Sequence, residues 1–249
     1  MMQHYYYHLK NSLIEILNHS NLVNNRKKIR ECIKNERAER CFIVATGPSI
    51  NNFDFSPIKN DVIIGVNTLY RGLDRLGFEP KYYVFTDERV FFENGNYEKV
   101  IERNTKVFVG ASIYYTVIKK KMFYDNLFFV KPLGIITPDR FSRDILKGAY
   151  KGHSVVIFAL QLAYSLGFKK VYLVGADYTT TDGKHFDGNA YDFKLNAADY
   201  PKQYRMVFES YNICNDYFKR DGREIINLSP QSNLPIFPKQ SINEVFNGR

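Results

Sequence analysis

The chain has 249 residues, 45% of them hydrophobic, and a formal net charge of +9. This size suits one large α/β domain, or one domain with an appendage. No run of about 18 apolar residues occurs, which argues against a membrane-spanning helix. The first ten residues lack the apolar core of a signal peptide, and three scattered cysteines indicate reduced thiols in a cytosolic protein.

The positive charge favours partners that carry phosphates or an anionic surface. No nucleic-acid motif accompanies it, so we expect no nucleic-acid partner. Most of the 19 Tyr and 20 Phe residues fall in strand-like runs, where they are expected to pack in the core.

Residues 1–40 are predicted to form a basic helical extension, with eight Lys and Arg against four Asp and Glu. Apolar residues recur at helical spacing, and a polar break between two helices is expected over residues 18–25. The extension either packs on the domain or on a second subunit, or it contacts an anionic membrane face. The apolar positions are Leu9, Leu13, Ile16, Leu17, Ile29 and Ile33.

The segment Cys41–Ile50 is predicted to be a buried strand that ends in the loop Thr46-Gly47-Pro48-Ser49. Gly47 allows backbone to approach a ligand closely, and Pro48 stiffens the turn. The loop lacks the three spaced glycines of the dinucleotide fingerprint and the Lys of a P-loop. It is either a ligand-binding loop or an ordinary strand-to-loop turn.

Two further predicted strands also end in polar residues. Residues 61–67 end at Asn67, and residues 81–85 are followed by Thr86 and Asp87. The carboxyl ends of parallel strands meet at one edge of a sheet, where ligands of α/β proteins bind. We therefore expect these clusters to form one site. A short helix over 68–76, a helix over 90–103 and a fourth strand over 106–110 complete this part.

Residues 112–150 show a less regular pattern. A clear helix then follows Ser154, which is placed as its N-cap; phosphate binding at this terminus is the functional alternative. A fifth strand over 169–178 ends at Gly175 and Asp177, and a polar loop containing His185 comes next. A helix over 197–219 and a last strand over 224–228, closed by Ser229, precede a tail expected to pack back on the domain.

These motifs together resemble two related groups of proteins. The motifs are the Gly-Pro-Ser loop, Val-Asn-Thr-Leu at 66–69, residues 85–93 and the block 165–178. One group is the Rossmann-like domain named for archaeal 6-hydroxymethylpterin pyrophosphokinase, also found in motility-associated factors of flagellin glycosylation. The other is the bacterial CMP-sialic acid transferases of lipooligosaccharide synthesis. The resemblance covers about residues 41–235.

The resemblance implies an α/β fold: a Rossmann-like, mostly parallel sheet with helices on both faces, in a catalytic domain spanning 41–249. It also implies nucleotide contacts from the loop after the first strand and the amide after the second. Thr46 stands where the transferases have Asn, and Asp87 where they have an amide, which suggests a metal or a sugar contact instead. The expected nucleotide-binding residues are Thr46, Gly47, Pro48, Ser49, Asn67, Asp87, Ser154, Gly175 and Ser229.

The transferases use a histidine as general base, but the matching region over 199–204 contains none. His185 lies earlier and is the candidate base, because its ordinary pKa of about 6.5 suits proton removal near neutrality. Its alternative is a surface histidine without a role, and His153 has a weaker claim. Asp177 is the second candidate catalytic residue.

Three functions follow from these residues. The first is a glycosyltransferase using a CMP-linked, sialic-acid-like donor in bacterial surface glycan synthesis, with no cofactor expected. The second is a pyrophosphokinase whose Mg²⁺ would be held by Asp87 and Asp177. The third is a non-catalytic glycan-assembly module. Expected partners are a nucleotide-sugar donor and a glycan or lipid-linked acceptor. We further expect a cytoplasmic protein, with a homo-oligomer and peripheral contact with the inner membrane as additional possibilities.

Overall fold

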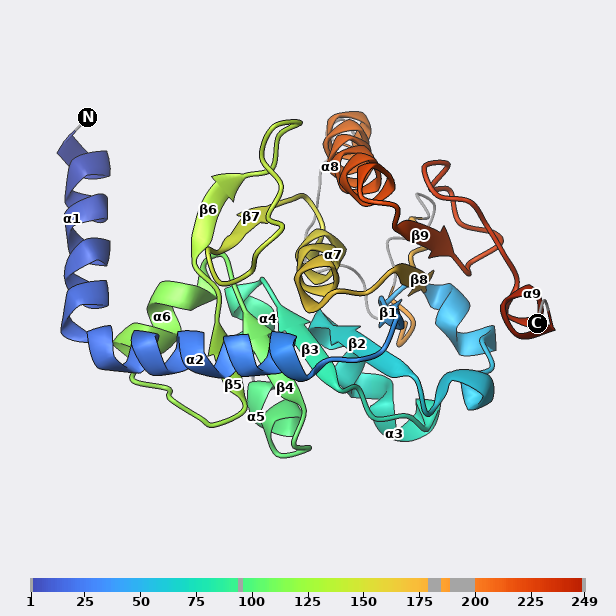
Figure 1. Ribbon diagram of the computed structural model, residues 1–249, viewed down its shortest axis with the longest axis horizontal. Coiled ribbons are helices and arrows are strands. Elements are labelled where there is room, and N and C mark those ends of the chain that lie inside the picture. The colour runs from blue at the N-terminus through green and yellow to red at the C-terminus, as the bar shows by residue number, and fades with distance from the viewer. Residues whose placement is uncertain (1, 94–95, 179–184, 189–199, 248–249) are drawn as a thin grey trace.

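The fold is built on a parallel sheet of seven strands (Figure 1). The computed structural model describes residues 2–93, 96–178, 185–188 and 200–247. The seven strands lie in the order β5-β4-β3-β2-β1-β8-β9, and every neighbouring pair is parallel. They are β1 (Arg40–Val44), β2 (Val62–Val66), β3 (Tyr82–Phe85), β4 (Lys106–Val109), β5 (Leu127–Phe129), β8 (Lys170–Val174) and β9 (Glu224–Asn227).

Helices cover both faces of this sheet, so its strands are apolar on both sides. In β1, Cys41 and Ile43 face one buried cluster, whereas Phe42 and Val44 face the other. The first cluster is closed by α2 (His19–Asn35), α7 (Val155–Leu166) and α8 (Tyr200–Arg220). The second is closed by η1 (Pro48–Asn52), η2 (Ser56–Ile58), η3 (Asn67–Gly72), α3 (Leu73–Leu76), α4 (Glu88–Phe92), α5 (Asn96–Ile101), α6 (Ile113–Lys119) and α9 (Ile242–Asn247).

The predicted α/β class and the strands are confirmed, while several segments differ in detail. The region 112–150 holds α6, β5 and a separate two-stranded ribbon of β6 (Pro132–Ile135) and β7 (Ala149–Lys151). The helix predicted over 90–103 is two segments, because Glu93 adopts an extended conformation that ends α4. The tail packs back on the domain as predicted, with Leu234 and Phe237 buried.

The polar break predicted over residues 18–25 is wrong. Only Asn18 separates α1 (Met2–Leu17) from α2, and residues 19–25 are helical. Asn25 is polar yet buried, because its side-chain amide donates to the Phe129 carbonyl at 2.8 Å and accepts the Phe129 N–H at 2.9 Å. The polar side chain therefore ties α2 to the sheet instead of interrupting the helix.

The two N-terminal helices differ in their contacts. Ile29 and Cys32 bury α2 in the first cluster, whereas α1 stands away from the sheet at an angle to α2 (Figure 1) and exposes Leu13 and Leu17. In the described part of the chain, no helix combines the length and apolar character that a membrane span needs.

The strand order creates a crossover point at β1. The chain leaves β1 toward β2 and continues outward to β5, then returns through α7 to add β8 on the other side of β1. Ligands of open α/β sheets bind at such a point, beyond the carboxyl ends of the strands. The topology therefore directs attention to the loops that follow β1 and β8.

Glu36 joins the end of α2 to β3. Its carboxylate accepts hydrogen bonds from Lys81 Nζ and the Tyr82 hydroxyl, each at 2.8 Å, and from the Ala38 N–H at 3.1 Å. Burial acts to raise the pKa of Glu36, but the hydrogen bonds from Lys81 and Ala38 outweigh it, so this pKa lies below its ordinary value of 4.5.

We expect Glu36→Gln to reduce the free energy of unfolding by about 1–3 kcal/mol, because the amide NH₂ would face hydrogen-bond donors instead of acceptors. A lowered pKa in the folded state stabilises the fold above the unfolded-state pKa, and this contribution is lost as the pH falls through the folded value. Urea unfolding should show a constant deficit near neutral pH that shrinks below about pH 4.5. The exposed control Glu39→Gln should show neither effect; a deficit independent of pH would contradict the assignment.

Candidate functional site

The loops after β1 and β8 stay paired beyond the ends of the two strands. The Ala45 N–H donates to the Val174 carbonyl at 2.8 Å, and the Gly47 N–H donates to the Gly175 carbonyl at 2.9 Å. A Cβ atom at position 47 would lie only 2.5 Å from the Asp177 Oδ2 atom. The predicted need for glycine at this position therefore comes from a close approach of the chain itself.

Asp177 holds the loop in place. Its buried carboxylate accepts the Ser49 N–H at 2.7 Å and also accepts a hydrogen bond from the Ser49 hydroxyl. The Ser229 Oγ lies 3.2 Å from the Ser49 Oγ and accepts the Gly175 N–H at 3.0 Å. The structure thus brings Gly47, Ser49, Gly175, Asp177 and Ser229 together at the crossover point.

The backbone donors of Gly47, Ser49 and Ile50 are already used. The N–H groups of Gly47 and Ser49 are bound as described, and the Ile50 N–H donates to the Gly47 carbonyl at 3.3 Å. Pro48 has no N–H to offer. These three N–H groups are therefore not available to a ligand while the loop keeps this conformation.

His185 lies at the end of β1. Its Nδ1 atom is 2.9 Å from the Thr46 hydroxyl, and the next residue, Phe186, donates its N–H to the Thr46 carbonyl at 2.9 Å. The Asn51 amide in turn donates to the Phe186 carbonyl at 2.8 Å. These contacts orient the imidazole beside the loop, whereas His153 is exposed at the surface.

The end of β2 carries two buried polar atoms without a partner. Among the described residues, these are the Asn67 Oδ1 and the Thr68 Oγ1. Asn67 also has a left-handed backbone, with φ of +41°. Buried polar groups are nearly always hydrogen-bonded, so this pair is a candidate contact for a ligand or an ordered water. Sequence reasoning grouped Thr68 with Asn67 in the polar cluster after this strand but selected only Asn67 as a binding residue.

Asp87 and Ser154 both cap helices at the same edge. Asp87 accepts the Arg89 N–H at 2.9 Å and pairs with its guanidinium at 2.8 Å. Burial acts to raise the pKa of Asp87, but the bonds from Arg89 leave it below its ordinary value. Ser154 accepts the Val156 N–H at 3.3 Å and lines a cavity of about 50 Å³ together with Thr86 and Lys151.

Asp87 and Asp177 do not fit a shared metal ion. They follow β3 and β8, which are separated by β2 and β1. Three strand spacings amount to about 14 Å, whereas two ligands of one Mg²⁺ each lie about 2.1 Å from it. Within the described residues, no group of three metal-ligating side chains comes together.

Comparisons with known proteins agree with this fold. A family model described as 6-hydroxymethylpterin diphosphokinase MptE-like matches residues 16–183. A probable 3-deoxy-manno-octulosonic acid transferase of Escherichia coli (strain K12) is 22% identical over 199 residues, covering 66% of this chain and 70% of that protein.

A solved structure with a similar fold is that of MAf glycosyltransferase from Magnetospirillum magneticum AMB-1. The match has a TM-score of 0.51 and 17% identity, and it covers 88% of this chain. The chain corresponds to only 38% of that protein's length. At this identity the likeness establishes the fold alone.

Asp177 supplies a direct test of how the loop is held. We expect Asp177→Asn to lower the free energy of unfolding by about 1–3 kcal/mol, since its amide nitrogen would face a donor of Ser49. Urea unfolding measures the loss. The same change at the exposed Asp125 should leave the unfolding midpoint unchanged, and equal midpoints for both variants would contradict the proposed clamp.

Proposed function

This chain belongs to the 6-hydroxymethylpterin diphosphokinase MptE-like family, and we propose that it acts as a glycosyltransferase with a CMP-linked acidic sugar as donor. The relatives named as a glycosyltransferase and as a transferase of a sugar acid support this reaction class. The observation that carries the nucleotide site is the unpartnered pair at Asn67 and Thr68, next to the loop that follows β1. Bacterial surface glycan synthesis is the proposed setting.

The electrostatics of the edge bear on where the donor phosphate would bind. The Asp177 carboxylate is buried at the crossover point, so a phosphate there would be repelled by a like charge. The N-terminus of α7 favours an anion, and Ser154 at this terminus faces the small cavity beyond β3. In the proposed arrangement the nucleoside contacts Asn67 and Thr68, and the sugar on its phosphate lies within reach of His185.

His185 would act as the general base. It takes the proton of an acceptor hydroxyl, whose oxygen attacks the anomeric carbon while the bond to the CMP phosphate breaks. The 2.9 Å contact with Thr46 fixes the imidazole at the end of β1. Because Asp87 and Asp177 follow strands separated by two others, we do not favour the pyrophosphokinase alternative, in which both bind one Mg²⁺.

Binding of CMP tests the site. A ligand at about 100 times its Kd stabilises the folded state by about 2.7 kcal/mol, which raises Tm by about 5–10 °C in a chain of this size. Thr68→Val removes an unpartnered hydroxyl, so we expect CMP to bind up to about tenfold more weakly while the unliganded stability is kept.

The control is Thr105→Val. The buried Thr105 hydroxyl donates to the Pro80 carbonyl at 3.0 Å, so this variant should lose stability and keep its CMP affinity. A thermal shift with ATP that requires Mg²⁺, in the absence of any shift with CMP, would overturn the proposal. A response to no nucleotide would favour a non-catalytic module.

Replacing the base tests the chemistry. We expect His185→Ala to reduce turnover by about 10²–10⁴-fold, the usual contribution of general-base catalysis. The measurement is release of CMP from CMP-activated acidic sugars in the presence of acceptor glycans. CMP affinity should stay nearly intact, and the exposed control His153→Ala should retain full turnover. Unchanged turnover in His185→Ala would remove the assignment.

A further inference from the structure

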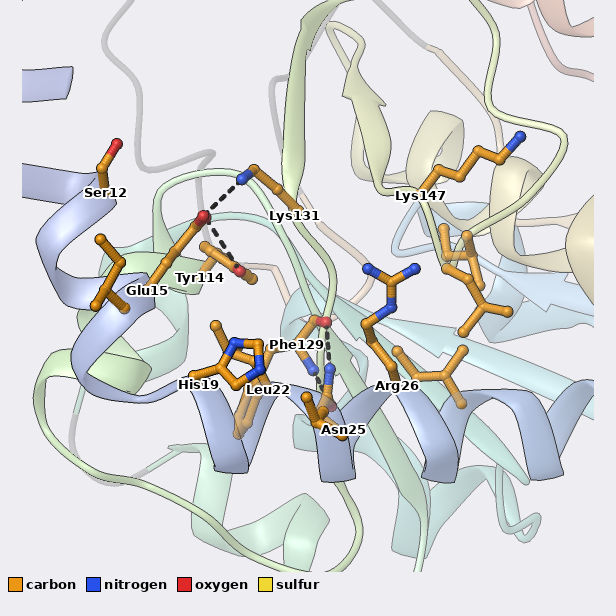
Figure 2. Close-up of a pocket in the computed structure, with 15 residues that line it drawn as sticks. Ser12, Glu15, His19, Leu22, Asn25, Arg26, Tyr114, Phe129, Lys131 and Lys147 are labelled. Carbon is orange, nitrogen blue, oxygen red and sulfur yellow. Dashed lines mark hydrogen bonds and ion pairs between the residues drawn. The ribbon is translucent and has the colours of Figure 1, made fainter. Parts of the chain in front are cut away.

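A second and larger cavity lies between the N-terminal helices and the end of β5. Its volume is about 390 Å³, which is within the range of small-molecule sites. Figure 2 shows its walls, which come from α1, α2, α6 and the segments around Lys131 and Lys147. None of the residues proposed to bind the nucleotide lines this cavity.

The lining carries an excess of positive charge. The lining contains three cationic side chains and one carboxylate, which gives a formal charge of +2 without His19. The cations are Arg26, Lys131 and Lys147, and the carboxylate is Glu15. Glu15 is already occupied, because it pairs with Lys131 at 2.7 Å and accepts the Tyr114 hydroxyl at 3.3 Å.

Two of these cations lack a counter-charge. Within the described part of the chain, neither Arg26 nor Lys147 forms an ion pair. In Figure 2 the guanidinium of Arg26 points from α2 into the space between the stems of Lys131 and Lys147. A guanidinium in this position presents the planar fork of donors that matches a phosphate group.

The cavity is preformed by hydrogen bonds in its walls. Asn25, next to Arg26, is bound to both backbone groups of Phe129. On the opposite wall, the Ile145 N–H donates to the Ser165 hydroxyl at 2.9 Å, and the Ala149 N–H donates to the Lys131 carbonyl at 2.9 Å. Rigid walls reduce the entropy lost when a ligand binds.

We propose that this cavity binds a phosphate group carried by the acceptor glycan or glycolipid. Lys131 lines this cavity, and its neighbour Pro132 lines the small one that contains Ser154, so the two sites adjoin. Four strand spacings separate β5 from β1, which places the phosphate about 19 Å from the end of β1. An acceptor that spans this distance is several sugars long. The assignment of this phosphate to the acceptor rests on the proposed function, whereas the binding of phosphate in the cavity does not.

The test compares two double variants of α2 and its surroundings. Arg26→Gln with Lys147→Gln removes both unpaired cations, and the control, Arg30→Gln with Lys34→Gln, removes two exposed charges of α2 outside the lining. Inorganic phosphate is titrated while the amide chemical shifts of the cavity walls are followed. We expect saturable binding in the wild type and the control, and about tenfold or greater weakening in the cavity variant.

Two further measurements are needed. The first tells whether the phosphate belongs to a lipid or to a soluble glycan, and the second separates the phosphate site from the proposed transferase function. The first is co-sedimentation with vesicles of phosphatidylglycerol and phosphatidylcholine. If the cavity variant alone loses co-sedimentation, the phosphate belongs to a lipid. If the wild type binds phosphate but does not co-sediment, the phosphate belongs to a soluble glycan. CMP affinity should be equal in all three proteins, and failure of the wild type to bind CMP would overturn the transferase without affecting the phosphate result. Equal phosphate binding by both variants, or none in the wild type, overturns the cavity assignment.

Discussion

The contact between the Asp177 carboxylate and the Ser49 backbone is the constraint on which the rest of the site depends. It joins the loop after β1 to the loop after β8 at the point where the order of the strands reverses. The approach is so close that position 47 has no room for a Cβ atom. These contacts hold the loop after β1 against the loop after β8, and the other groups of the site lie beside it.

The fixed position of the loop after β1 determines which polar groups surround it at the carboxyl edge of the sheet. The N–H groups of Gly47 and Ser49 are already bound, and other polar side chains lie on either side of the loop. Asn67 and Thr68 lie at the next strand, and His185 is oriented by Thr46 at the first.

The helical region before the sheet is more closely integrated than its polar composition indicates. Asn25 in α2 and Glu36 directly after it are both buried polar residues, and each is satisfied by groups of the sheet. Such fully bonded polar contacts position an element more specifically than apolar packing alone. They fix α2 beside β5, and this placement creates the cavity that carries Arg26. The same sequence of elements thus supplies both the proposed donor edge and the proposed phosphate subsite.

The sequence by itself determined the α/β class, the strands β1, β2, β3, β4, β8 and β9, and the polar residues that follow β1, β2 and β8, because buried parallel strands are continuous apolar runs with abrupt polar ends. It did not show β5, β6 or β7. It could not show that Asp177 binds Ser49, that Thr68 lacks a partner, or that Asp87 and Asp177 lie far apart, since these facts depend on strand order. It also misplaced the helix break at residues 18–25, because a polar residue whose partner lies 104 positions away looks the same in sequence as one in water. Long-range pairing decided these points, and only the tertiary structure contains it.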